Sequence, residues 1–435
     1  MRSLRVELRG VEKDGVWTYY GIPYAIVADR FGAPEAAPAW AGVLDATTPG
    51  PTAPQGERSF AGTDMSAILG TGWDRGSDYL TLNIWSANSN GPAMPVMVYV
   101  HGGGFLSGSG HASMYDGTDF ARDGVVLVTL NYRLGAIGWL DLPGAPRNRG
   151  LLDVIAALRW IRDHIDEFGG DPDNVTLFGQ SAGAMLIAAL IADPAADGLV
   201  RRAISQSGGA HMFGAEQADR VTRALARRLG IAPTLEAFRQ VSDETLVEAT
   251  TGLVVDTRFD RSLGTSPFKP VLDDLTLAPV DLLIGTNEAE AGLYVHAPVT
   301  DEDVRRAASR RDPDPERLVA EYRLRFAEPF DQLIALMTEQ FETGSTRIAQ
   351  AHQGKVWAYR FGLDGAAIHC AELPFVFRPG PMHEAWVRFA TVGDPGWAPY
   401  PWIEPLTDSR PRPSVAARIC STQSGAVGSK ARSAP

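Results

Sequence analysis

The sequence has few cysteines, an excess of acidic over basic residues, and no long apolar segment. Its two cysteines among 435 residues, Cys370 and Cys420, give no disulfide framework and fit a reducing cytoplasm. A formal net charge of −12 argues against nucleic acid and anionic membrane as main partners, because both would be repelled. The N-terminal MRSLRVELRG lacks the apolar segment of a signal peptide, and no stretch is long enough to span a bilayer. We therefore expect a cytoplasmic protein that has neither nucleic acid nor a membrane as a partner.

Motifs that hold metal ions or nucleotides are absent as well. The chain contains no HExxH and no CxxC, which are common metal-binding patterns. It also contains no GxxxxGK[ST] loop and no strand–GxGxxG–helix unit for phosphate groups. The sequence therefore predicts that neither a metal nor an organic cofactor is needed.

What the sequence has instead is a series of apolar, β-branched runs that alternate with helical patterns. Residues 150–168 place apolar side chains on one helical face, and residues 215–250 and 301–352 are charged and helical in pattern. Buried strands are predicted at 95–101, 124–131, 174–179, 201–209, 278–286 and 355–361. This order predicts the α/β class, with a central, mostly parallel β-sheet covered by helices on both faces. We expect one domain over residues 1–420 and a disordered tail at 421–435.

The stretch VTLFGQSAGA at 175–184 contains the pattern Gly179-x-Ser181-x-Gly183 between a predicted strand and a predicted helix. A strand–turn–helix elbow of this kind presents the serine hydroxyl to a base and a substrate. The alternative is a chance match, since the chain contains 45 glycines. The motif alone does not decide between them.

A second unusual loop, His101-Gly102-Gly103-Gly104-Phe105, directly follows the predicted strand at 95–101. Consecutive glycines free backbone N–H groups to face a developing negative charge, as in an oxyanion hole. A flexible turn and a phosphate cradle are the alternatives, and the missing phosphate motifs disfavour the cradle.

A serine nucleophile needs a histidine base and an acid that orients it, in the chain order serine, acid, histidine. Among the later histidines, His369 follows a predicted strand, whereas we expect His352 on a solvated helix and His383 in a proline-rich loop. Two glutamates, Glu288 and Glu290, follow the predicted strand at 278–286. The residue pattern does not choose between these two acids.

Together these segments resemble the type B carboxylesterase family, which includes the cholinesterases and bacterial p-nitrobenzyl esterases. The similarity runs over roughly residues 15–405 and keeps its motifs in order. The matching segments are YYGIPYA (19–25), SDYLTLNIW (77–85), HGGGF (101–105), NYRLGAIGWL (131–140), residues 147–184, AISQSGG (203–209), GTNEAEAG (285–292), HCAELPFVF (369–377) and VGDPGWAPYP (392–401).

The resemblance implies an α/β-hydrolase fold and a serine hydrolase that cleaves small-molecule carboxylic esters. By position, it implies Ser181 as the nucleophile, Glu290 as the acid and His369 as the base. Two further groups of residues follow from the same alignment of motifs. The oxyanion N–H groups would come from Gly103, Gly104 and Ala182, and the polar groups behind the triad would be Gln180, Ser207 and Glu372.

The chain also departs from the family pattern. Gln180 replaces the usual Glu beside the nucleophile, Ala289 the usual Asp of the acid loop, and Cys370 the usual Gly after the base. The segments after 270–274 and from Phe377 to Trp386 are short, which predicts an open pocket that prefers small, uncharged or weakly polar esters. Two alternatives stay open: a carbamate or amide hydrolase with the same triad, and a non-catalytic binding protein of the cholinesterase type.

Overall fold

The structure, a computed structural model, describes residues 7–40, 42–57, 60, 63–87, 91–257, 266–363 and 367–407, without the side chains of 255–257. The expected tail at 421–435 and Cys420 lie outside the described residues.

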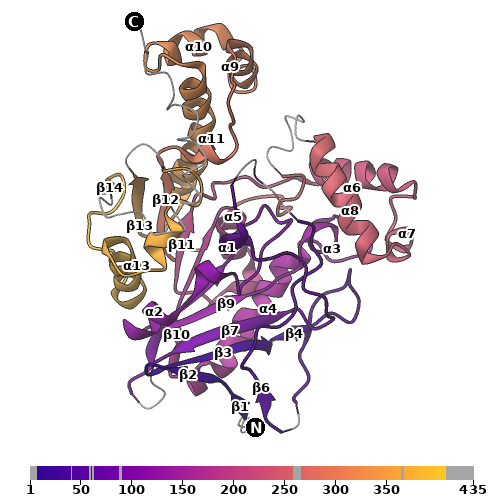
Figure 1. Cartoon of the computed structure of the whole chain (residues 1–435), viewed down its shortest axis with the longest axis vertical. Coiled ribbons are helices and arrows are strands. Elements are labelled where there is room, and N and C mark those ends of the chain that lie inside the picture. Colours follow the sequence, from indigo (N-terminus) through magenta and orange to yellow (C-terminus); the bar gives the residue numbers. More distant parts are fainter. Residues whose placement is uncertain are drawn as a thin grey trace, which may run out of the picture.

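The centre of the molecule is a 10-stranded sheet in the order β14-β13-β12-β11-β10-β8-β9-β7-β3-β2 (Figure 1). All neighbours from β14 to β9 run parallel, and β7, β3 and β2 are added antiparallel at the other end. The mostly parallel sheet expected from the sequence is therefore confirmed. Its strands are β2 (Val11–Lys13), β3 (Val16–Pro23), β7 (Thr81–Ser86), β8 (Met94–Val100), β9 (Val126–Leu130), β10 (Gly170–Gln180), β11 (Arg202–Gln206), β12 (Asp281–Asn287), β13 (Val356–Gly362) and β14 (Ile403–Thr407).

Two short pairs of strands lie beside this sheet. They are β1 (Leu8–Arg9) with β6 (Leu44–Asp45), and β4 (Ala25–Ile26) with β5 (Glu35–Ala36).

Helices cover both faces of the sheet, which explains why its central strands are continuous apolar runs. In β8 the side chains of Val96 and Val98 belong to a core shared with α4 (Arg149–His164) and α5 (Ala182–Ile191). The alternate residues of the same strand, Met97 and Tyr99, belong to a second core. That core is shared with α2 (Thr118–Arg122) and α13 (Pro381–Val392), and includes the fully buried Trp386.

The two charged helical regions of the sequence form two separate groups of helices (Figure 1). The first group is α6 (Ala215–Leu229), α7 (Leu235–Arg239) and α8 (Asp243–Thr257). The second group, α9 (Asp301–Ala308), α10 (Pro315–Arg323) and α11 (Pro329–Ala351), has an apolar cluster of its own. The remaining helical segments are short: α1 (Ser66–Leu69), α3 (Gly135–Trp139), α12 (Leu373–Val376), η1 (Ser113–Tyr115), η2 (Ile165–Phe168), η3 (Pro194–Ala196) and η4 (Glu290–Leu293).

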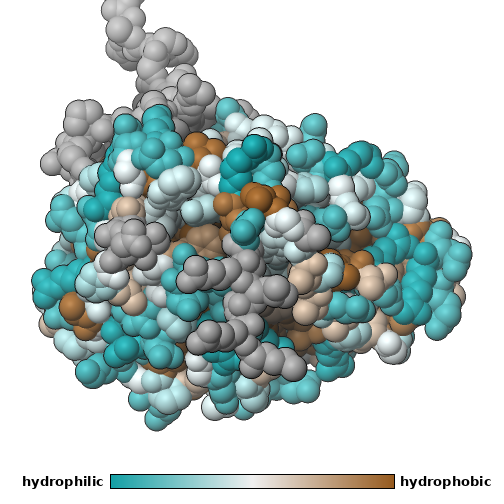
Figure 2. Space-filling model, turned by 90° about the horizontal axis from the view of Figure 1, so that it is seen from below, coloured by the Kyte–Doolittle hydropathy of each residue, from teal (hydrophilic) through white to brown (hydrophobic). Residues whose placement is uncertain are grey.

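Among the described residues, few large apolar side chains are exposed. On the face seen in Figure 2, hydrophilic residues predominate and hydrophobic residues form small patches between them. Within the described ranges, no helix has the length and apolar character that crossing a membrane requires.

Candidate active site

Ser181 lies in a sharp turn between β10 and α5, with φ 58° and ψ −120°. This left-handed conformation is strained for a residue with a Cβ. A Cβ on Gly179 would lie 2.6 Å from the backbone oxygen of Val100, and one on Gly183 only 2.0 Å from the same oxygen. Both glycines are therefore required because β8 passes directly against the turn. The local geometry is that of a nucleophile elbow.

The triple-glycine loop packs on this elbow. A Cβ on Gly102 would lie 2.8 Å from the backbone oxygen of Gln180, and Gly103 has φ 106°. Gly103, Gly104 and Ala182 line the same cavity as Ser181. The three residues expected to supply oxyanion N–H groups thus meet at one place, although they come from two distant parts of the chain.

His369 and Glu290 form a buried hydrogen-bonded pair. Their contacting atoms, His369 Nδ1 and Glu290 Oε2, are 2.5 Å apart, and the two side chains are 2% and 0% exposed. The second carboxylate oxygen, Oε1, accepts a hydrogen bond from the backbone N–H of Asn287 at 2.8 Å. Glu288, the other acid that the sequence left open, is exposed. The structure therefore brings Glu290, and not Glu288, to His369.

The other ring nitrogen of His369, Nε2, accepts a hydrogen bond from Gln180 Nε2 at 3.2 Å. The Gln180 oxygen in turn accepts one from Cys370 Sγ at 3.4 Å. These contacts are satisfied when Nδ1 carries the proton and Nε2 is free of it, which is the tautomer a general base needs. Two of the three residues that depart from the family pattern, Gln180 and Cys370, thus contact each other beside His369.

A network of buried polar groups lies behind the pair. Glu372 accepts hydrogen bonds from Asn287 Nδ2 at 2.6 Å and from Gln206 Nε2 at 3.2 Å. Burial, and then the nearby charge of Glu290, raises the pKa of Glu372 to about 7. Ser207 directly follows β11 with φ 58°, and its buried Oγ has no hydrogen-bond partner among the described residues.

Asn287 and Gln206 connect Glu372 to the sheet, and neither was among the site residues predicted from the sequence. The only available signal was their place at the carboxyl ends of β12 and β11, where ligand sites of parallel sheets form. Two expectations were also wrong. His352 is buried at the end of α11 and hydrogen-bonds the backbone oxygen of Val280 at 2.6 Å. His383 lies fully buried in α13, 3.0 Å from Asp123.

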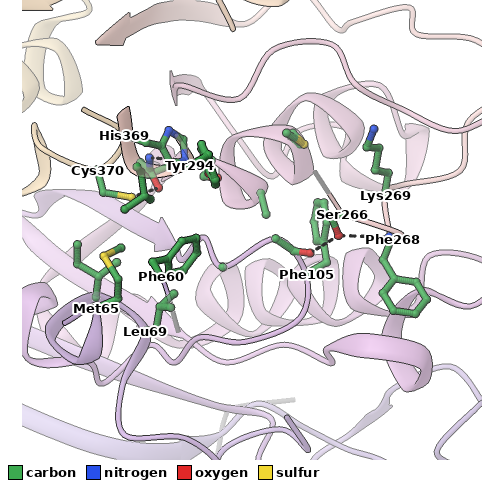
Figure 3. A pocket seen from close by; sticks show the side chains of 18 residues that line it. Phe60, Met65, Leu69, Phe105, Ser266, Phe268, Lys269, Tyr294, His369 and Cys370 are labelled. Atoms are coloured by element: carbon green, nitrogen blue, oxygen red, sulfur yellow. Dashed lines mark hydrogen bonds between the residues drawn. The ribbon is translucent and has the colours of Figure 1, made fainter. Parts of the chain in front are cut away.

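Ser181 and His369 line one cavity of about 40 Å³, which Figure 3 shows from close by. In that view His369 and Cys370 lie on one side and Ser266, Phe268 and Lys269 on the other. Phe60 also lines a neighbouring cavity of about 330 Å³ whose wall includes residues of α3 and α8. Among the residues that the structure describes, no three His, Cys, Asp or Glu side chains are grouped to hold a metal ion.

The sheet is mostly parallel and an elbow follows β10. Glu290 and His369 follow β12 and β13. These features together define an α/β-hydrolase. Comparison with known proteins gives the family. Residues 5–396 match the model of the carboxylesterase family. The chain belongs to this family and is a carboxylic ester hydrolase.

Curated relatives and solved structures agree over nearly the whole length. The chain is 34% identical to the para-nitrobenzyl esterase of Bacillus subtilis, over 91% of this chain and 90% of that protein. It is 35% identical to the phenmedipham hydrolase of Pseudarthrobacter oxydans, over 89% of each. The solved structure of a thermophilic PNB esterase matches with a TM-score of 0.79 at 32% identity, over 92% of this chain and 94% of that one.

Proposed function

We propose that Ser181, His369 and Glu290 are the catalytic triad of this ester hydrolase, with the backbone N–H groups of Gly103, Gly104 and Ala182 as its oxyanion hole. The substrates are esters of small molecules, and the reaction takes place in the cytoplasm without a metal or an organic cofactor. The observation that carries this proposal is the buried pair of His369 and Glu290, 2.5 Å apart, in which His369 lines the same cavity as Ser181.

In the first half of the reaction, Ser181 attacks the ester carbonyl and His369 Nε2 takes its proton. Gln180, which donates to Nε2 in the free enzyme, gives up this contact when Ser181 takes its place. Glu290 keeps the Nδ1 proton in position and stabilises the imidazolium that forms. The oxyanion of the tetrahedral intermediate is held by the backbone N–H groups, each of which can contribute ~3 kcal/mol.

Collapse of this intermediate breaks the ester C–O bond, and His369 returns its proton to the departing alcohol. A water molecule then attacks the acyl-enzyme on Ser181, with His369 as base once more. The products are a carboxylic acid and an alcohol, and the triad ends in its starting protonation state.

Labelling with an organophosphonate tests the nucleophile directly. The wild-type enzyme should take up one phosphonyl group per chain on Ser181 and lose its esterase activity in the same proportion. Ser181→Ala should take up none, show no turnover above background, and melt close to the wild type, because the elbow already accepts small residues. Near-native turnover by folded Ser181→Ala would refute the mechanism.

Carbamates and amides are the second class of substrate that the same attack could serve, and a relative is named phenmedipham hydrolase. An ester, a carbamate and an anilide with the same acyl and aryl groups separate these activities. We expect kcat/KM to be highest for the ester. A higher value for the carbamate would favour the alternative.

A further inference from the structure

Lys269 is a basic residue that lines the catalytic cavity. It lines the same cavity as Ser181 and His369, on the side opposite His369 in Figure 3. This is unexpected in a chain with a formal net charge of −12. No sequence motif pointed to Lys269 as a site residue, because it lies before the acid loop that resembles the family.

Hydrogen bonds on both sides fix the position of Lys269. Before it, Ser266 Oγ donates to the backbone oxygen of Gly104 at 2.7 Å and accepts from the backbone N–H of Phe268 at 3.2 Å (Figure 3). After it, the backbone oxygen of Pro270 accepts from Phe213 at 2.9 Å. The segment that carries Lys269 is therefore attached directly to the triple-glycine loop.

The charge of Lys269 is not neutralised by the described part of the chain. Its Nζ lies 4.8 Å from the centre of the Phe213 ring, and none of the described carboxylates is within ion-pair distance of it. Burial, and then the charges of Lys269 and Arg347, lower the pKa of His211. Burial lowers the pKa of Lys269 itself to about 8, so it is mostly protonated at neutral pH.

We propose that Lys269 is a specificity residue that binds the carboxylate of anionic esters, so that the substrate class of this enzyme is esters with a carboxylate in their acid or alcohol half. The inference rests on the proposed function of Ser181, His369 and Glu290. It departs from the preference for uncharged esters that the sequence suggested. A cation in a partly desolvated cavity gains more from an anion than an exposed lysine does, because water screens the attraction less.

Two matched pairs of substrates test this proposal, one for each half of the ester. The first pair is 4-acetoxybenzoate and its neutral methyl ester, in which the charge lies on the leaving group. The second is mono(4-nitrophenyl) adipate and its neutral methyl ester, in which the charge lies on the acyl group. In each pair the ratio of kcat/KM for the anion to that for the neutral ester is measured, with the uncatalysed rate subtracted.

In the wild type at least one pair should favour the anion. Lys269→Met should lower kcat/KM for that anion by about tenfold, mainly through KM, and leave its neutral partner within about twofold, because only the charge attraction is lost. Lys269→Glu should lower it further, and Lys269→Arg should restore most of the preference. The matched control is Lys355→Met, which removes an exposed lysine just before β13 and should change neither ratio.

Each result has one meaning. Anion-to-neutral ratios that are equal in wild type and folded Lys269→Met, for both pairs, would overturn the assignment of Lys269 while leaving the esterase mechanism intact. Failure of the wild type to hydrolyse either neutral ester would instead count against the proposed function. If Lys269→Met does not fold, Lys269→Arg and Lys269→Glu still give opposite expectations for the same ratios.

Discussion

Replacing Glu290 with glutamine tests the acid of the proposed triad, because the chain offers a matched control two residues away. In Glu290→Gln the side-chain oxygen can still accept from Asn287, so the loop should keep its shape. The glutamine amide would contact His369 Nδ1 but carries no negative charge. It can also donate to Nδ1, which would place the ring proton on Nε2 and remove the base. Glu288→Gln changes an exposed side chain and should have little effect.

The size of the effect follows from the burial of the pair. Glu290 and His369 are 0% and 2% exposed, so water screens their interaction poorly. The imidazolium that forms during catalysis lies about 4 Å from the carboxylate charge, an attraction of about 4 kcal/mol at an effective dielectric constant of about 20. Since about 1.4 kcal/mol corresponds to a factor of ten, kcat should fall about a thousandfold in Glu290→Gln.

The assay is kcat and KM for 4-nitrophenyl acetate with both variants, alongside a thermal melt that shows the folded fraction. We expect the loss in kcat for Glu290→Gln with a nearly unchanged melting temperature, and wild-type kinetics for Glu288→Gln. Equal, small losses for the two variants, or a larger loss for Glu288→Gln, would refute the assignment of the acid.

Three further predictions concern stability, the oxyanion loop and the acyl pocket. The pKa of Glu372 is raised to about 7 from 4.5, so the folded state holds a proton that the unfolded state loses, and wild-type stability should fall between pH 4.5 and 7. The melting temperature of Glu372→Gln should fall less than that of the wild type across this window, and equal slopes would contradict the argument. Gly103→Ala places a Cβ 1.8 Å from the backbone oxygen of Ser107 and should abolish activity. Its control, Gly124→Ala, has a similar positive φ but no atom within 4 Å of the new Cβ, and should only slightly destabilise the folded state. Equal loss of activity in both variants would rule out a local effect. Across 4-nitrophenyl esters, kcat/KM should rise over the first few carbons and then flatten, because the cavity of about 40 Å³ can bury few methylenes at ~0.8 kcal/mol each; an optimum at about eight carbons or longer would count against it.

Much of the fold could be predicted because its signals are local. The apolar runs that became β8, β9 and β10 are buried on both faces, so their side chains need no alternation to be recognised as strands. The amphipathic pattern at 150–168 likewise gave α4 and η2. His352 and His383 were placed wrongly because a polar or proline-rich sequence neighbourhood says little about burial. Each is buried by contacts with distant residues, Val280 and Asp123.

The candidate site divides in the same way. Gly179 and Gly183 predict the turn around Ser181, because only glycine permits the close approach of β8 that this turn requires. The residue pattern could not identify the partner of His369, since Glu288 and Glu290 lie in the same stretch of sequence. Periodicity and composition treated them alike.

By itself, therefore, the sequence determined the strands, the helices and the glycine turns, whose causes lie within a few neighbouring residues. Tertiary structure alone decided which side chains meet. His369 and Glu290 are 79 residues apart, and Cys370 and Gln180 are 190 apart. Lys269 lines the cavity of Ser181 and His369, and hydrogen bonds of Ser266 to Gly104 and of Phe213 to Pro270 hold its segment there. The physical reason is that parallel strands bring their carboxyl ends to one edge of the sheet, so loops distant in sequence share one small volume.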